Sequence, residues 1–288
     1  MDAAAFRQSE EQIGEFTING IGHFPGNTRL SGKMIPTIRC HIILGLCLLV
    51  SNARADGVPA DCTQLIVGVG PSWDSMHGEM QLFERSSPGG KWVKSGAAFP
   101  VLFGKTGAAW GYGLAGQNEK GLRKKEHDGR APAGIFRIGK IYTYDVQLPP
   151  GSDYPFHQVT TADAWIDDVN SPDYNRFVTI DNPAQPPPWF EKQKMRHNDF
   201  AYRWLVEIRH NSDPPVPGRG SAIFFHIRRG VNRPTAGCTT MAEGDLVNLI
   251  RWLRASRHPC YVLLPRNEYE SRQRMWGLPD TDQLPQMQ

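Results

Sequence analysis

Short runs in which apolar and polar residues alternate recur along the chain and predict β-strands. Three early runs, at 65–69, 80–85 and 99–103, are separated by glycine, proline and serine, which is typical of antiparallel strands joined by turns. Alternation returns after Phe136 and again over 202–210, where apolar side chains fall on one side and charged ones on the other. This pattern predicts a mainly β fold of the α+β class.

The stretch 220–241 brings strand, loop and helix patterns close together. A turn-rich link joins it to the strand at 202–210, so we expect a hairpin-like pair. An apolar run delivers His226, a polar loop follows, and Gly237 and Cys238 end that loop. The stretch therefore combines an imidazole and a thiol in one structural unit.

A helix is predicted to begin directly after Cys238. Thr240 and Glu243 have the spacing of a capping box, and the apolar residues at 246, 249, 250 and 253 share one helical face. The first N–H groups of a helix are unpaired, and its dipole favours negative charge. We therefore expect this helix to favour a thiolate and a developing oxyanion at Cys238.

Cys238 and His226 together suggest nucleophilic catalysis. They lie twelve positions apart, and a thiol becomes a nucleophile when an adjacent base accepts its proton. Taken alone, a strand histidine is usually a core group and a buried cysteine a small hydrophobe. A zinc site is the other alternative, but no second pair of Cys or His residues lies nearby, so we expect neither a metal nor a cofactor.

Three segments are predicted to lie outside regular structure. The glycine-rich segment 104–116 lacks the flanking elements of a phosphate-binding loop, so we interpret it as a surface loop. The segment 119–130 carries many charges of both signs, and its His127 is expected to be solvated. The proline-rich, aromatic region 141–193 is interpreted as either a functional covering loop or a disordered insert.

The charge of the chain argues against nucleic acid as a partner. Lys and Arg total 32 against 29 Asp and Glu, which gives a net charge of +3 over 288 residues. No long run of one sign is present, and such runs or patches are what nucleic-acid binding requires.

Residues 1–55 are predicted to be an N-terminal extension that ends in a signal peptide. Arg39 precedes the apolar run 42–50, and small residues surround a cleavage position after Ala55. The run is too short to span a bilayer as a folded helix. We expect export to the periplasm or cell envelope with no stable membrane span after cleavage, the alternative being an uncut N-terminal anchor.

Cleavage at that position leaves three of the five cysteines, Cys62, Cys238 and Cys260. An odd number in an oxidising compartment usually leaves one thiol free. Cys62 and Cys260 both adjoin strand-like runs, so we hypothesise that they form a disulfide that ties the ends of the domain. Three free thiols are an equal alternative, because connectivity cannot be deduced from sequence.

Two motifs give the chain a resemblance to a known family. His226 followed by Thr-Ala-Gly-Cys at 235–238, together with Arg-Ala-Pro-Ala-Gly-Ile-Phe at 130–136, resembles the L,D-transpeptidase catalytic domain of the YkuD type. Its signatures are a P-x-G-x-F turn and an H…[ST]-H-G-C loop. The resemblance implies a β sandwich with a capping helix after the cysteine, in a domain that we place at 62–265 before a C-terminal tail at 266–288.

The resemblance also implies an activity on the stem peptides of peptidoglycan. Cys238 is then the acylated nucleophile, His226 its general base, and the N–H groups of Gly237 and Cys238 the oxyanion hole. Carboxylates of the stem peptide are expected to bind to three arginines: Arg228, Arg229 and Arg233.

Two positions depart from the family pattern. Ala236 stands where a histidine usually precedes the Gly-Cys pair, and Thr240 stands where Arg or Asn usually follows the cysteine by two places. Both alter the walls of the site, which suggests a divergent branch. The sequence leaves three possible acyl acceptors: an amine, another protein and water. With water as the acceptor, the protein would be an L,D-carboxypeptidase or amidase. A non-catalytic wall-binding domain is a further alternative.

Overall fold

The computed structural model describes residues 57–286. The predicted extension and signal peptide at 1–55 lie outside these residues. No helix within 57–286 is both long and apolar enough to cross a membrane.

Strands dominate the described part of the chain, as the alternating pattern predicted, and helices are few and short. The strands are β1 (Gln64–Gly70), β2 (His77–Glu84), β3 (Val93–Leu102), β4 (Ala108–Trp110), β5 (Ala131–Thr143), β6 (Phe156–Gln158), β7 (Asp163–Trp165), β8 (Phe177–Thr179), β9 (Trp204–Ile208), β10 (Phe224–Ile227), β11 (Thr239–Met241) and β12 (Cys260–Pro265). The helices are α1 (Phe190–Gln193), α2 (Glu243–Trp252) and α3 (Arg266–Trp276), with short 3-10 turns η1 (Phe200–Tyr202), η2 (Ala255–Arg257) and η3 (Thr281–Gln283).

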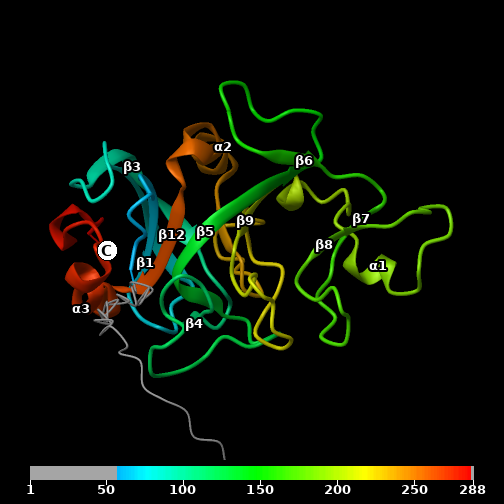
Figure 1. Cartoon of the computed structure of the whole chain (residues 1–288), viewed down its shortest axis with the longest axis horizontal. Coiled ribbons are helices and arrows are strands. Elements are labelled where there is room, and N and C mark those ends of the chain that lie inside the picture. Colours follow the sequence, from blue (N-terminus) through cyan, green and yellow to red (C-terminus); the bar gives the residue numbers. More distant parts are fainter. Residues whose placement is uncertain (1–56, 287–288) are drawn as a thin grey trace, which may run out of the picture. The chain divides into compact units, whose positions relative to one another are not determined.

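Most strands belong to one sheet that closes on itself. Its order is β12-β1-β2-β3-β11-β10-β9-β5-β4, and β12 also pairs with β5, so β12 lies between β1 and β5 (Figure 1). Eight strands thus form a ring around buried side chains such as Phe225, Tyr261 and Ile135. The resemblance implied two packed layers, whereas these pairings give a closed sheet, in which neither β5 nor β12 is a free edge.

The expected hairpin is confirmed, and one expected loop is wrong. β9 and β10 pair antiparallel, with Phe225 opposite Val206. The segment 104–116, interpreted as a surface loop, instead contains β4, which is buried and runs parallel to β5. Trp110 explains the difference, because its ring packs edge-on against Trp73 at 4.8 Å and Trp276 at 6.3 Å.

The C-terminal segment is also better ordered than a tail. Helix α3 begins at Arg266 and buries Tyr269 and Trp276 in the main core. The Tyr269 hydroxyl donates to the Pro279 carbonyl at 2.9 Å, and Leu284 is buried as well. The expected tail at 266–288 is therefore, up to residue 286, part of the folded domain.

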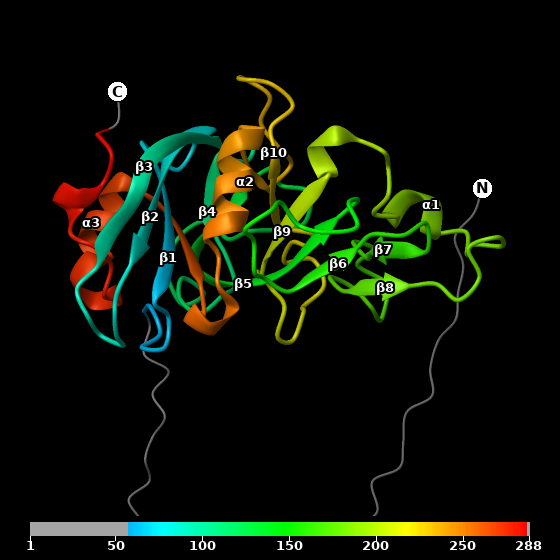
Figure 2. The ribbon, with the colours of Figure 1, turned by 90° about the horizontal axis from the view of Figure 1, so that it is seen from above.

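The region 141–193 folds into a small lobe rather than a disordered insert. β7 and β8 form a separate two-stranded sheet, and with α1 they lie at the end of the domain opposite α3 (Figures 1 and 2). Inside the lobe the buried Asp163 carboxylate accepts hydrogen bonds from Thr160, Thr179 and His157. Burial alone would raise the pKa of Asp163, but these donors lower it.

Cys62 and Cys260 lie against each other as buried free thiols, so the hypothesised disulfide is not present in the structure. The Cys62 thiol donates to the Gln64 carbonyl at 3.1 Å, and the Cys260 thiol donates to the His258 carbonyl at 3.8 Å. The interaction between the two sulfurs lowers the pKa of Cys62, and together with burial it raises the pKa of Cys260. Cys62 comes three residues before Leu65 of β1, which lies opposite Cys260 of β12.

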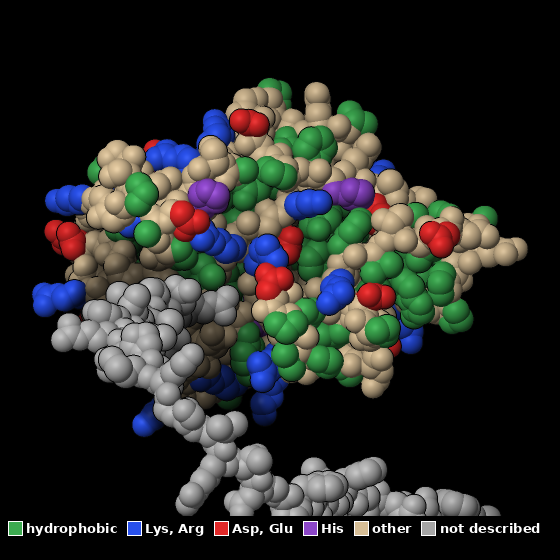
Figure 3. All heavy atoms as spheres, viewed as in Figure 1, with side chains coloured by type: hydrophobic (Ala, Val, Ile, Leu, Met, Phe, Trp, Pro, Cys, Tyr) green, Lys and Arg blue, Asp and Glu red, His purple; other side chains and the backbone are tan. Residues whose placement is uncertain are grey.

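The surface carries charges of both signs. On the face seen in Figure 3, Lys and Arg side chains alternate with Asp and Glu side chains and form no continuous patch of one sign. His127 is exposed, as expected.

Candidate active site

Strand register brings Cys238 and His226 to the same face of the sheet. β10 and β11 pair in parallel, with Phe225 opposite Thr239 and His226 opposite Thr240. Cys238 precedes β11 and thus lies beside Phe224, two residues before His226, and alternate residues of a strand point to the same side. Both side chains line one cavity of about 190 Å³. The structure therefore brings together the thiol and the imidazole singled out in the sequence.

The expected capping box after Cys238 is wrong. Helix α2 starts at Glu243, its N-cap is Ala242, and no side chain caps it. The three residues after Cys238, Thr239–Met241, form strand β11 and pair with β10. This strand separates Cys238 from the helix. The predicted apolar face is buried through Leu246, Leu249, Ile250 and Leu253. The start of the helix therefore does not lie at the thiol, and its dipole does not explain how the thiol is activated.

Cys238 carries a neutral thiol at neutral pH. Its Sγ–H donates to the carbonyl of Ala222, with 3.5 Å between Sγ and the oxygen. Burial raises the pKa of Cys238 to about 11, although the Phe224 N–H and the positive charges of Lys124 and Arg229 act in the opposite direction. A base must therefore remove the proton during the reaction.

His226 is a neutral base whose orientation is fixed. Its side chain is buried, and Nδ1 lies 2.9 Å from the Ile227 carbonyl. A carbonyl only accepts, so Nδ1 carries the proton and Nε2 keeps a free lone pair. The Tyr202 ring packs edge-on against the imidazole at 5.1 Å. Burial lowers the pKa of His226 to about 4, and the Ile227 carbonyl opposes that shift only in part.

Within residues 57–286 no hydrogen bond joins Cys238 to His226; the thiol donates to Ala222 instead. Catalytic hydrogen bonds are often long without substrate and shorten in the reactive complex. The Cys238 side chain is only partly buried, and it lines the same cavity as His226.

Thr235 holds the loop that leads to Cys238. Its Oγ1 donates to the Cys238 carbonyl at 2.6 Å and accepts the N–H of Gly237 at 3.1 Å. Its backbone N–H donates to the Phe103 carbonyl at 3.2 Å, and its carbonyl accepts from Lys105 at 2.8 Å. The sequence motif alone assigns Thr235 no role of its own, although a threonine before a glycine turn is typical of such side-chain bonds.

The two oxyanion-hole candidates differ in availability. The Gly237 N–H is already bonded to Thr235. The Cys238 N–H has no hydrogen-bond acceptor in the described part of the chain. Gly237 is also tightly packed, because a Cβ there would lie 3.0 Å from the carbonyl oxygen of Arg130. Glycine thus allows the loop to approach the neighbouring backbone.

Two of the three candidate arginines lie at the site. Arg229 and Arg233 line a second cavity of about 320 Å³ that also touches His226 and Thr240. Arg229 pairs with Asp199, and its guanidinium lies 4.7 Å from the centre of the Tyr202 ring. Arg228 lines neither of these two cavities; its backbone N–H bonds the Met241 carbonyl.

Residues of the small lobe form much of the thiol's cavity, and the sequence pattern did not single them out individually. Trp165 and Gln193 of the lobe line it, together with Met195 and Tyr202 from the segment that follows the lobe. The covering-loop interpretation of 141–193 agrees with this position. The proline and aromatic content was the signal in the sequence, but it could not show which side chains face the thiol.

Asn175 joins the lobe to the strand that carries His226. Its Oδ1 accepts from the Trp165 indole N–H and the Ala222 N–H, each at 3.0 Å. Its Nδ2 donates to the carbonyls of His210 at 3.0 Å and Asn211 at 2.8 Å. The sequence around it is typical of a turn, whereas the structure makes this asparagine a buried clamp between the two parts.

Comparison with protein families gives one match, in which the sequence profile of the L,D-transpeptidase catalytic domain (YkuD) covers residues 92–262. The chain belongs to this family. No curated protein matches the chain. No solved structure matches it either.

As a YkuD-type L,D-transpeptidase domain, the chain keeps both parts of its site inside the matched region. The match contains β5, which begins with the Ala-Pro-Ala-Gly turn residues, and both His226 and Cys238. It also contains the lobe that lines the cavity of the thiol. The family acts on peptidoglycan.

Proposed function

We propose that the protein is an exported, cysteine-dependent L,D-transpeptidase that acts on peptidoglycan stem peptides in the periplasm or cell envelope. One observation carries the proposal: the Cys238 thiol and the His226 imidazole share a strand face and line one cavity. Nucleophile and base in reach of a common reacting atom are the requirement for acyl transfer.

In the first half of the reaction, Cys238 Sγ attacks the carbonyl carbon of the L-centre of a diaminopimelate-type residue. The thiol proton passes to Nε2 of His226, the nitrogen left free by the Nδ1 bond to Ile227. The tetrahedral intermediate then breaks its C–N bond, and His226 gives the proton to the departing amine of the terminal D-alanine. The product on the enzyme is a thioester at Cys238.

In the second half, the amine of another stem peptide attacks the thioester carbon. His226 takes the proton of that amine, the C–S bond breaks, and the proton returns to the sulfur. Water in place of the amine gives L,D-carboxypeptidase activity with the same residues. The Cys238 N–H supports the oxyanion in both halves, because it is the free donor of the two candidates.

Arg229 and Arg233 are the proposed contacts to the stem-peptide carboxylates. They line the cavity on the other side of His226, and guanidinium groups bind carboxylates through paired hydrogen bonds. The buried Thr240 Oγ1 lines the same cavity and has no partner within the described residues. Its hydroxyl offers a further hydrogen bond to a bound carboxylate.

Incubation of the purified protein with defined muropeptides tests this function. Mass spectrometry of the intact protein should detect an acyl adduct on Cys238, and analysis of the muropeptides should detect loss of D-alanine with new cross-links. Shortened stems without cross-links assign water as the acceptor. Cys238→Ala should show neither adduct nor product.

Two results contradict the proposal. One is turnover that persists in Cys238→Ala, which excludes the nucleophile. The other is a folded wild-type protein that binds muropeptides without forming an adduct or changing them, which favours the wall-binding alternative.

A further inference from the structure

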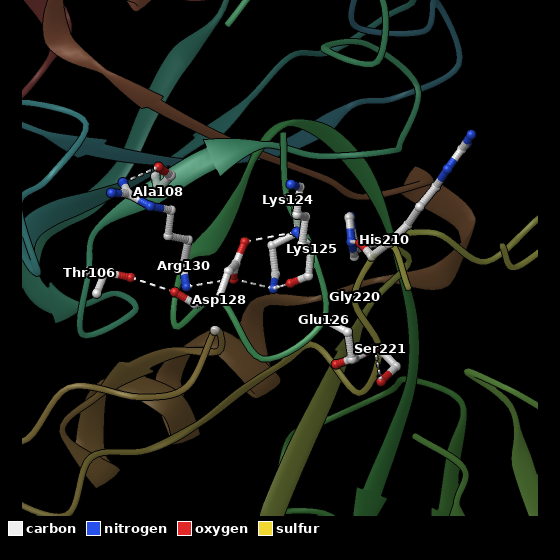
Figure 4. A network of polar contacts seen from close by, with 12 residues as sticks. Thr106, Ala108, Lys124, Lys125, Glu126, Asp128, Arg130, His210, Gly220 and Ser221 are labelled. Carbon is white, nitrogen blue, oxygen red and sulfur yellow. Dashed lines mark hydrogen bonds and ion pairs between the residues drawn. The ribbon is translucent and has the colours of Figure 1, made fainter. Parts of the chain in front are cut away.

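The turn 124–130 lies beneath the loop that ends in Cys238. Its Lys124 is only 2% exposed, and Nζ donates to the Asp128 carboxylate at 2.6 Å and to the Lys125 carbonyl at 2.6 Å. Asp128 also accepts the backbone N–H groups of Lys125 at 2.8 Å and Arg130 at 2.9 Å (Figure 4). Because these partners offset the cost of burying the ammonium group, Lys124 is held in one position.

The side chain of Lys124 contacts both backbone segments that surround the sulfur. Its Cε lies 3.1 Å from the position that a Cβ would take on Gly220 and 3.7 Å from that position on Gly237. Gly237 directly precedes Cys238. Gly220 lies two residues before Ala222, whose carbonyl accepts the thiol. One buried side chain therefore supports both sides of the nucleophile.

The same turn holds the Gly220 segment through a second residue. The Glu126 carboxylate accepts from Ser221 Oγ at 2.9 Å and from the Tyr174 hydroxyl. The Tyr174 oxygen in turn accepts the Gly220 N–H at 3.1 Å. The segment 220–222 is thus fixed from the turn and from the lobe at once.

Lys124 is also the buried cation close to the thiol. Burial raises the pKa of Cys238, whereas the Phe224 N–H and the charges of Lys124 and Arg229 lower it. Arg229 is partly exposed and paired with Asp199 at the surface, where solvent screens its charge. A charge inside the protein is screened much less.

We propose that Lys124 is a positioning residue, which fixes the backbone on both sides of Cys238 and stabilises the negative charge on its sulfur while His226 holds the proton. The inference rests on the proposed function only for its role in turnover, because the ionisation of Cys238 can be measured without any substrate. Asp128 limits the effect, since its carboxylate partly neutralises Lys124.

The rate of alkylation of Cys238 by iodoacetamide tests the proposal in the full chain, because this rate follows the fraction of thiolate. Rates are compared at pH 8, with the Cys238 peptide quantified by mass spectrometry. Lys124→Met should slow alkylation by roughly three- to tenfold, one pKa unit corresponding to tenfold. Lys124→Arg should stay near wild type.

The direction of the change separates an electrostatic role from simple loosening of the fold. Loosening exposes the buried thiol to water and to the reagent and should accelerate alkylation, whereas loss of the positive charge should slow it. Lys125→Met, which removes the same charge from an exposed neighbour, should leave the rate unchanged. If Lys124→Met does not fold, Lys124→Gln replaces it, because an amide can still donate to the Asp128 carboxylate and the Lys125 carbonyl. An unchanged or faster rate in the folded variant overturns the proposal. Normal Lys124 effects without muropeptide turnover would instead refute only the proposed function.

Discussion

At the scale of single residues, the site starts from an uncharged pair. Burial raises the pKa of Cys238 to about 11 and lowers that of His226 to about 4. At neutral pH neither group is ionised. In the proposed reaction the thiol therefore loses its proton to a base as it attacks, rather than being stored as a thiolate in an ion pair with imidazolium. The Ile227 carbonyl, which fixes Nδ1–H, decides which nitrogen is that base.

This protonation state predicts the acid side of the pH profile. Because the pKa of His226 lies below its ordinary value of 6.5, the imidazole stays neutral as the pH falls, and the base is lost only near pH 4. We expect the rate of acyl-adduct formation at pH 5 to remain close to its value at pH 7. An unperturbed imidazole would be almost wholly protonated at pH 5. A decline centred near pH 6.5, measured on protein still folded by circular dichroism, contradicts the assignment.

A glycine substitution tests the close approach of the loop. A Cβ on Gly237 would lie 3.0 Å from the Arg130 carbonyl oxygen and 3.3 Å from Ile223 Cδ1, so Gly237→Ala requires the loop next to the nucleophile or its neighbours to give by a fraction of an ångström. A shift of about 1 Å in a reacting group can cost on the order of a hundredfold in rate. We expect the smaller displacement here to slow acyl-adduct formation by roughly three- to tenfold, measured by intact mass over time.

Gly244→Ala is the matched control. Gly244 lies in α2, and a Cβ there meets nothing within 4 Å. Alanine favours the helix over glycine, and Gly244 is the second residue of α2, so this variant should be at least as stable as wild type with an unchanged rate. Equal rates for the two variants would show that the Gly237 loop tolerates the methyl group.

At the scale of elements, the site depends on contacts between segments distant in the chain. β10 carries His226, the end of the loop at 235–238 carries the thiol, and the turn 124–130 lies beneath both. The lobe between β5 and β9 lines the cavity through Trp165 and Gln193. Asn175 is the residue through which this lobe bonds directly to the backbone at Ala222.

Replacement of Asn175 should therefore affect both stability and activity. Asn175→Ala removes four hydrogen bonds. The His210 carbonyl keeps its bond from the Ser212 hydroxyl, but the Trp165 indole N–H and the Asn211 carbonyl lose their partner, and each such buried group costs about 1–3 kcal/mol. We expect a loss of roughly 3 kcal/mol or more in urea unfolding, with slower adduct formation. Asn182→Ala removes one hydrogen bond of an exposed loop and should change stability by less than about 0.5 kcal/mol. Equal effects of the two substitutions on stability and adduct formation would show that Asn175 does not hold the lobe to the backbone at Ala222.

At the scale of the whole molecule, local pattern predicted more of the strands than of their arrangement. Alternation at 202–210 locates β9. The combination of a histidine with a Gly-Cys turn singles out Cys238 and His226 in the sequence, and in the structure both line one cavity. The closure of β5 onto β12 could not be predicted in this way, because residues such as Ile135 and Val262 are paired through tertiary packing. The predicted capping box at Thr240 is absent for a similar reason, because Thr240 lies in β11 and pairs with His226 of β10. In the sequence, Lys124 looks like its exposed neighbours in the charged segment 119–130. The high density of charges there does not show that this one lysine is buried.

The closed sheet also determines where the two ends of the domain meet. β1 and β12 lie side by side, and this places the thiols of Cys62 and Cys260 in contact. Oxidised glutathione should accept two electrons and two protons from this pair, which forms one S–S bond and two reduced glutathione molecules. The bond would close a loop that spans most of the domain, and such cross-links typically stabilise by about 2–4 kcal/mol, chiefly by restricting the unfolded chain. We therefore expect oxidation to raise the urea midpoint of wild type and to have no effect on Cys62→Ser. Alkylation of both thiols after unfolding of the oxidised sample, with an unchanged midpoint, would show that the buried pair stays reduced.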